Sequence, residues 1–263
     1  MKHSTVKKTL HVDNPFGAPV YHEATVSSTM EVARALAAQN EGHGTVITAD
    51  FQEAGRGRLG RPWVTERGAN LLFTILLRYN DFASIPEALT LRTGLAVSLA
   101  VEDLAPALSG LVKVKWPNDV MICSGKAGYK AAGILTEGDG KNVYIGVGVN
   151  VSQRDFAEEY RSRAGSIIRA EAALPENARF VLLGKILARL YAEIEKPPSP
   201  WRERLVQRLY KKGEIVTFAP GAADSDRLVE GTLSGLGDGG ELLIIPVGEA
   251  AEQSFITGEL RVY

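Results

Sequence analysis

Hydrophobic positions divide the chain into segments of extended and helical period. Residues 70–78, NLLFTILLR, form a continuous apolar run of strand length, which is typical of a strand covered on both faces. Residues 112–116 instead alternate apolar residues with Lys113 and Lys115, the period of a strand with one buried face. Further strands are predicted at 44–52, 131–137 and 142–151, and a hairpin turn at 138–141.

Four segments carry apolar residues three and four positions apart and predict helices, at 27–39, 84–105, 176–195 and 201–213. In the first, Ser28 and Glu31 have the spacing of a capping box, and Met30, Ala33 and Ala37 share one face. Ser84 and Glu87 have the same capping spacing at the start of the second, and its buried stripe is predicted to be Leu91, Leu95 and Leu99.

The pattern changes at Gly213, after which short apolar runs are separated by Gly and Asp turns. These runs, at 213–218, 227–237, 241–247 and 254–263, predict a small β-barrel or sandwich of about 50 residues. Residues 1–20 read as a poorly structured lead. The sequence therefore predicts a lead at 1–20, a domain of helices and strands at 21–212 and a small β domain at 213–263.

The composition is that of a globular protein, with 263 residues, 45% hydrophobic residues and a net charge of -1. No window reaches the roughly 18 apolar residues of a membrane span, and the basic start is not followed by the apolar run of a secretory signal. Cys123 is the only cysteine, which excludes an intramolecular disulfide and a cysteine zinc cluster and favours the cytoplasm. The balanced charge argues against a dedicated nucleic-acid-binding protein.

One loop, FQEAGRGRLGRPW at 51–63, departs from this balance. It contains Gly55, Gly57 and Gly60, which permit close approach to a ligand, and Arg56, Arg58 and Arg61. Each guanidinium can bind carboxylate or phosphate oxygens with two hydrogen bonds. Such cations would favour a reaction between two anions, for example a carboxylate and a nucleotide triphosphate. A solvated surface turn is the alternative. No GxxxxGK[ST] occurs in the chain, and although GRGRLG at 55–60 has the spacing of GxGxxG, arginines occupy its variable positions, so we do not interpret it as a dinucleotide-binding loop.

Other candidate residues lie at strand ends. Asn118 and Asp119 follow the strand ending at Trp116, where polar groups often line the sites of sheet-based enzymes. Lys130 precedes an apolar strand, and Asn150 ends the small-residue run GVGVN. Each has a plainer interpretation: an ordinary turn in which Asp119 holds an arginine, a solvated lysine, and a tightly packed strand.

Together these segments resemble the biotin protein ligases. The resemblance rests on SST at 27–29, QEAGRGRLGRPW at 52–63, KWPND at 115–119, KAAGILTE at 130–137 and GVGVN at 146–150, in the order and spacing of that family, and extends from about Tyr21 to the C terminus. It implies an α+β fold, in which a catalytic domain with a mixed β-sheet flanked by helices is followed by a small SH3-like β-barrel.

The resemblance implies a two-step reaction. Biotin and ATP form biotinyl-5′-AMP and pyrophosphate, and a lysine of a biotin carboxyl carrier protein then attacks the mixed anhydride and releases AMP. Mg²⁺ is expected to arrive with ATP, so no protein metal site is expected. Two alternatives stay open. A lipoate–protein ligase would share the fold and chemistry, although its RRxSGGG-type signature is missing, and a nucleic-acid-binding module is disfavoured by the acidic pI.

Residue roles implied by the resemblance follow its motifs. The catalytic residues are expected to be Lys130 and Arg56, near the biotin carboxylate and the α-phosphate. The biotin-binding residues are expected to be Ser28, Thr29, Gln52, Gly55, Arg56, Gly57, Arg58, Lys130, Gly133 and Leu135, with Trp63 closing over the biotin tail. The ATP-binding residues are expected to be Arg58, Arg61, Asn118, Asp119, Lys130 and Asn150, and the loop is expected to close over the reactants.

Two features depart from the family. Met30 stands where Asn is common, and we expect it to be a core contact on its helix rather than a biotin ligand. Only about 20 residues precede the matching region, too few for the helix-turn-helix of the members that repress transcription, so no operator DNA and no membrane are expected as partners. The resemblance is compatible with a homodimer formed through a sheet edge.

Overall fold

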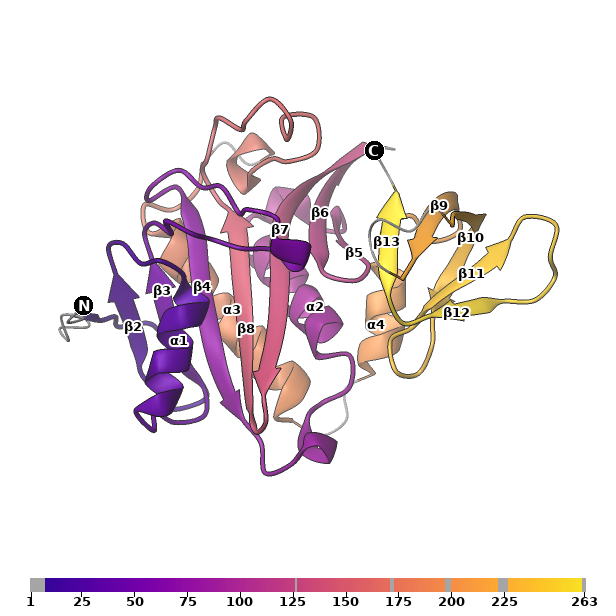
Figure 1. Ribbon diagram of the computed structural model, residues 1–263. Coiled ribbons are helices and arrows are strands. Elements are labelled where there is room, and N and C mark those ends of the chain that lie inside the picture. The colour runs from indigo at the N-terminus through magenta and orange to yellow at the C-terminus, as the bar shows by residue number, and fades with distance from the viewer. Residues whose placement is uncertain (1–7, 126, 171–172, 197–199, 222–226, 262–263) are drawn as a thin grey trace.

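The computed structural model describes residues 8–125, 127–170, 173–196, 200–221 and 227–261. Its larger part is an eight-stranded mixed sheet with helices on both faces, and a smaller antiparallel sheet lies beside it (Figure 1). The strand order of the larger sheet is β1-β2-β3-β4-β8-β7-β6-β5, in which only β2 and β3 pair in parallel. The predicted α+β class is confirmed.

Five strands of the larger sheet agree with the predicted segments. Three were not predicted, namely β1 and β2 at one edge and β6 between β5 and β7. The strand bounds are β1 Lys8–Thr9, β2 Val20–Glu23, β3 Thr45–Ala49, β4 Asn70–Arg78, β5 Val112–Lys115, β6 Asp119–Ser124, β7 Ala127–Asp139 and β8 Asn142–Asn150. All residues of β4 except Arg78 are buried, as the continuous apolar run predicted.

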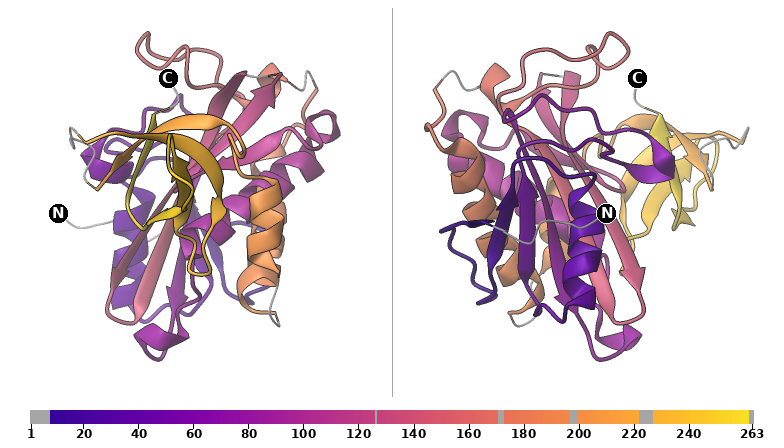
Figure 2. Two further views of the ribbon diagram at one scale, coloured as in Figure 1. Left: turned by 90° about the vertical axis from the view of Figure 1, so that its right-hand side faces the viewer. Right: turned by 60° about the vertical axis from the view of Figure 1, so that its left-hand side comes forward.

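The helices separate onto the two faces of this sheet. Their bounds are α1 Thr29–Ala38, α2 Leu89–Leu104, α3 Ala178–Ile194 and α4 Trp201–Gln207, with short 3₁₀ turns at Arg58–Gly60, Phe82–Ser84, Pro106–Leu108 and Ile167–Arg169. Helices α2 and α3 pack on one face and form the main core with alternate residues of β4, such as Phe73 and Ile75. Helix α1 packs on the opposite face, against Ile47, Leu76 and Tyr144 (Figure 2).

The two capping predictions have different outcomes. Ser28 is the N-cap of α1, and its hydroxyl accepts a hydrogen bond from the Met30 amide at 3.3 Å. The Glu31 carboxylate accepts from the Ser27 hydroxyl instead of completing a capping box with Ser28. The capping box at Ser84 is wrong, since α2 begins only at Leu89 and Ser84 donates its hydroxyl to Asp81 at 2.6 Å. Pro86 disfavours a helical conformation at Ile85, which would have been the first residue of the predicted helix.

The expectation of a poorly structured lead is wrong for residues 8–20; residues 1–7 lie outside the described part. Strand β1 pairs with β2, and Leu10, Val12 and Phe16 pack against the main core. This segment has no clear hydrophobic period, and most of its core partners are distant in the sequence. Its local pattern therefore predicts neither the strand nor the packing.

The smaller sheet contains β9 Ile215–Pro220, β10 Val229–Leu236, β11 Leu242–Pro246, β12 Gln253–Phe255 and β13 Gly258–Arg261, in the order β12-β11-β10-β9-β13. The last predicted strand is therefore two strands. Because only Ile256 and Thr257 separate β12 from β13, the sheet curls to bring its two ends together, although no pairing closes it among the described residues. Its core is continuous with Leu91, Leu95 and Trp116 of the larger part, which holds the two sheets together.

No helix among the described residues has the length and apolar character needed to cross a membrane.

Candidate functional site

A trough runs along the face of the larger sheet that carries α1. Strand register places Gly133 opposite Gly148, and Leu135 opposite Gly146, on this face. A Cβ added to Gly148 would lie 2.6 Å from the Trp63 ring, and one added to Gly146 would lie 3.0 Å from the Met30 methyl group. Only glycine at these positions leaves room for Trp63 and Met30 to pack against the strands. We call Gly133, Gly146 and Gly148 the glycine trough. It borders a cavity of about 290 Å³.

A buried chain of polar groups lines the cavity near the start of α1. The Thr29 amide and hydroxyl both donate to Gln52 Oε1, at 2.8 and 3.0 Å, and the Thr29 hydroxyl accepts from Thr74 at 2.9 Å. Ser28 also lines the cavity. These groups give a polar site beside an apolar floor, an arrangement suited to a ligand with a polar head and an apolar tail.

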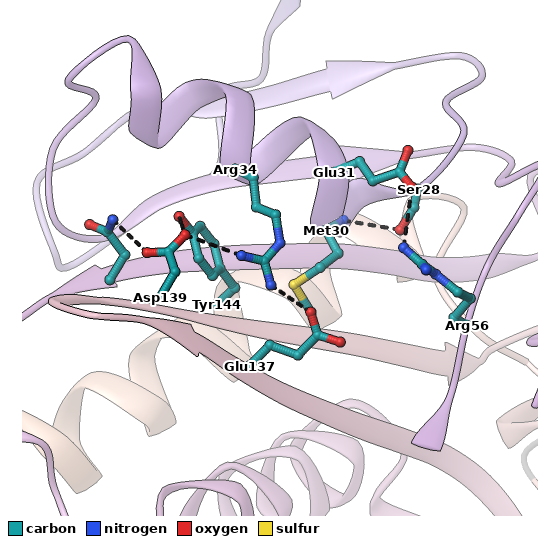
Figure 3. Close-up of polar contacts among 9 residues, drawn as sticks. Ser28, Met30, Glu31, Arg34, Arg56, Glu137, Asp139 and Tyr144 are labelled. Carbon is teal, nitrogen blue, oxygen red and sulfur yellow. Dashed lines mark hydrogen bonds and ion pairs between the residues drawn. The ribbon is translucent and has the colours of Figure 1, made fainter. Parts of the chain in front are cut away.

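Met30 and a neighbouring ion-pair group close the trough toward the β7–β8 hairpin (Figure 3). Met30 is buried in the core of α1 and also contacts the cavity, which confirms the expected core contact. Beyond it, Arg34 binds Glu137 at 2.7 Å and Asp139 at 3.1 Å, and its guanidinium lies 4.5 Å from the centre of the Tyr144 ring. This group ties α1 to the hairpin, which fixes the helix over the sheet.

The arginine loop forms a hairpin over the other end of the trough. The Trp63 amide donates to the Gly55 carbonyl at 2.9 Å, and the Gly57 amide donates to the Arg61 carbonyl at 2.8 Å. At the tip, Leu59 and Gly60 both have left-handed φ, 57° and 70°, so the turn carries backbone strain at an exposed leucine.

Each arginine of this loop has a different partner. Arg56 binds Glu31 of α1 at 3.2 Å, and Arg58 donates to Asn118 Oδ1 at 3.3 Å. Arg61 reaches the smaller sheet, where its two terminal nitrogens bind the two oxygens of Glu259 at 3.0 and 3.1 Å. This hydrogen-bonded arginine lowers the pKa of Glu259. The loop is thus connected to three separate elements.

Three charged groups gather where β5, β6 and β7 meet the trough. Lys130 Nζ lies 2.6 Å from Asp119 Oδ1 and 5.3 Å from the centre of the Trp63 ring. Lys115 Nζ lies 3.8 Å from the other Asp119 oxygen, and only 4% of this lysine is exposed. Burial lowers the pKa of Lys115, while the Asp119 carboxylate acts in the opposite direction.

A β-bulge directs Lys130 to this group. Val120 pairs with Ala132 but Met121 pairs with Lys130, so Ala131 is an extra residue in β7. In a regular strand Lys130 and Gly133 would face opposite sides of the sheet. The bulge turns Lys130 to the trough side, where its Nζ would lie 3.3 Å from a Cβ at Gly133.

The structure brings nearly all the predicted site residues to one cavity. Its lining includes Ser28, Thr29, Gln52, Arg56, Gly57, Arg58, Arg61, Asn118, Asp119, Lys130, Gly133, Leu135 and Asn150. Gly55 is instead buried at the base of the loop, outside this lining, where a Cβ would lie 2.9 Å from the Trp63 carbonyl. Asn150 donates to the Gly165 carbonyl at 3.3 Å.

Residues of this cavity that sequence reasoning missed include Lys115, Thr74 and Glu259. The alternation of residues 112–116 predicted Lys115 on an exposed face, yet that face carries the trough. Thr74 had a signal, as a hydroxyl within an otherwise apolar strand. Glu259 had none, because its contact with Arg61 spans 198 residues.

Comparison with known proteins agrees with the resemblance to the biotin protein ligases. Residues 23–150 match the Biotin/lipoate A/B protein ligase family. The chain is 30% identical over 231 residues to the biotin–[acetyl-CoA-carboxylase] ligase of Paracoccus denitrificans, covering 84% of this chain and 92% of that protein. It is 36% identical over 158 residues to the bifunctional ligase/repressor BirA of Bacillus subtilis, covering 57% of this chain and 46% of that protein.

Among solved structures, the Aquifex aeolicus biotin protein ligase in complex with biotin and ATP superposes with a TM-score of 0.74 at 29% identity, over 92% of this chain and 97% of that one. The match thus covers 92% of the Paracoccus denitrificans protein but only about half of the length of other relatives, such as the Bacillus subtilis protein.

Gly148→Ala tests the close packing of Trp63 on the trough. Because the new methyl group would overlap the indole, we expect the ring to move toward water, with a red-shifted tryptophan emission and stronger quenching by iodide. Gly138→Ala is the matched control, since its Cβ would lie 3.5 Å from its nearest neighbour, an ordinary contact. Equal spectra for both variants would contradict this packing.

Glu259→Gln tests the contact between the loop and the smaller sheet. A lowered folded-state pKa means that the ion pair contributes stability above the unfolded-state pKa and loses it as the pH falls through the folded-state pKa. Since the partner Arg61 is exposed, we expect the variant to lose only about 0.2–1 kcal/mol of unfolding free energy at pH 7, and less at acidic pH. Urea denaturation at pH 7 and at acidic pH measures the loss of unfolding free energy, with the exposed Glu230→Gln as control. A loss that does not change with pH would refute the Arg61–Glu259 ion pair.

Proposed function

Because this chain belongs to the biotin protein ligases, we propose that it activates biotin with ATP and transfers it to a lysine of an acceptor protein. In the first step a biotin carboxylate oxygen attacks the α-phosphorus of ATP, and pyrophosphate leaves. In the second, the acceptor amine attacks the carbonyl carbon of biotinyl-5′-AMP, and AMP leaves with the former carboxylate oxygen. The observation that carries this proposal is one cavity that joins a polar-ended trough to a cluster of cations.

Biotin is assigned to the glycine trough. The chain of Thr29, Gln52 and Thr74 supports placement of the ureido head there, since both donors and acceptors are within one small polar site. Leu135 and the glycines offer an apolar floor for the ring system and tail. The carboxylate would then point toward Lys130, which borders the same trough at Gly133.

ATP is assigned to the side of the cavity formed by the loop, β6 and β13. Arg58 and Arg61 supply guanidinium groups for phosphates, and Asn118, Asp119 and Asn150 supply polar groups at strand ends. We expect ATP to enter as its magnesium complex. In such a complex the substrate phosphates and water provide ligands for the ion.

Catalysis in this arrangement is electrostatic. Two anionic reactants repel each other in water, and fixed cations at the meeting point stabilise the charge that builds up during adenylyl transfer. Lys130 and Arg56 are the groups assigned to that point. The turn of the loop, with its hydrogen-bonded base at Gly55 and Gly57, would close over the anhydride and shield it from water.

The acceptor is proposed to be the biotin carboxyl carrier domain of a carboxylase. We take residues 21–212 as the ligase domain and 213–263 as a domain that assists ATP and acceptor binding, a role that the Arg61–Glu259 contact supports. The use of ATP and a single free cysteine favour the cytoplasm as the location.

Biotin-dependent exchange of labelled pyrophosphate into ATP tests the proposal. We expect exchange with biotin and ATP, and none when biotin is replaced by lipoate. Exchange with lipoate alone would identify a lipoate ligase, the runner-up with the same adenylation chemistry. A chain that supports exchange with neither acid would not be an enzyme of this class.

Lys130→Ala tests the assigned catalytic cation. Because its ammonium is assigned to charge that develops in the transition state, we expect adenylate formation to fall by about 10²–10³-fold, equivalent to roughly 3–4 kcal/mol, with little change in biotin affinity. Single-turnover formation of biotinyl-5′-AMP and calorimetric biotin binding measure the two quantities. Lys141→Ala, at the exposed β7–β8 turn, serves as control, and undiminished turnover of Lys130→Ala would refute the role.

A further inference from the structure

Lys115 is a buried cation to which the proposed reaction assigns no role. It ends β5 with 4% of its surface exposed, and strand register places it directly opposite Asp119 of β6. The register continues from Asp119 to Gly133 and from Gly133 to Gly148, so a single row across four strands leads from Lys115 into the glycine trough. Burying an ammonium is costly unless it is paired, so its retention here calls for a partner.

Asp119 forms ion pairs with two lysines whose side chains differ in exposure. One carboxylate oxygen lies 2.6 Å from Lys130 Nζ and the other lies 3.8 Å from Lys115 Nζ. The side chain of Lys115 is 4% exposed, whereas that of Lys130 is 29% exposed and borders the open cavity. Lys115 is therefore fixed in place, while Lys130 has room to move toward a ligand. The other charged groups that act on Lys115 are Glu259 and Arg61.

We propose that Lys115 is a positioning residue for adenylation: it is the permanent counter-ion of Asp119, so that Lys130 can turn from Asp119 to the reactants. Without Lys115, movement of Lys130 would leave a largely buried carboxylate with no adjacent cation, and the Asp119–Lys130 pair would persist at the expense of the reaction. With Lys115 present, Asp119 stays paired when Lys130 leaves. This inference rests on the proposed function.

Lys115→Met tests it, because methionine keeps most of the apolar stem and removes the charge. We expect single-turnover formation of biotinyl-5′-AMP to fall about tenfold at saturating ATP and biotin, with the KM for each substrate changed less than about twofold. Lys113→Met is the matched control, on the same strand and on the same side but outside the cavity lining, and its rate should equal that of the parent.

A double-mutant cycle separates positioning from direct contact. If Lys115 acts through Asp119, adding Lys115→Met to Asp119→Asn should cause little further loss of rate. Multiplying losses with a raised KM for ATP would mean that Lys115 binds the nucleotide itself, which overturns the inference. An unchanged rate together with a lowered melting temperature would show a packing role only and would overturn it as well.

The same assay distinguishes failure of this inference from failure of the proposed function. An active parent with a fully active Lys115→Met variant refutes the role of Lys115 and leaves the function standing. A parent that forms no biotinyl-5′-AMP refutes the proposed function, and the positioning role falls with it.

Discussion

The site depends on one carboxylate that holds two ammonium groups at the end of a sheet. Cations that are close enough to act on the same reactants repel each other, and a low-dielectric environment strengthens that repulsion. Asp119 offsets it by offering one oxygen to Lys115 and the other to Lys130. The rest of the larger part places this group, because the hairpin from β5 to β6 supplies Lys115 and Asp119, and the bulge in β7 supplies Lys130.

The glycine trough depends on the same strands. Side chains at Gly133, Gly146 or Gly148 would occupy the space that Trp63 and Met30 now fill, and these two residues could no longer pack against the strands that line the cavity. Helix α1 forms the opposite wall, and its position is set by apolar packing against the sheet and by the Arg34 ion pairs to the β7–β8 hairpin. A polar end, an apolar floor and a cationic end thus follow one another along a single sheet face.

The arginine loop connects parts of the molecule that are otherwise separate. Its three guanidinium groups contact α1, the turn before β6 and the smaller sheet through Glu31, Asn118 and Glu259. These are exposed or half-buried contacts of modest strength, so incoming anions can compete for the arginines without disrupting a core.

The sequence by itself determined the main elements and the kind of chemistry, because both are local. Apolar periodicity placed β4, α1 and α3, and an arginine-rich glycine loop with lysines and polar strand ends indicated a site for anions. Tertiary structure decided what local patterns do not encode. Pairing between distant strands made Lys115 an inner residue instead of a solvated one, and one extra residue in β7 turned Lys130 to the trough. It also joined Arg61 to Glu259 across 198 positions, since contacts of that span arise only when two sheets share one core.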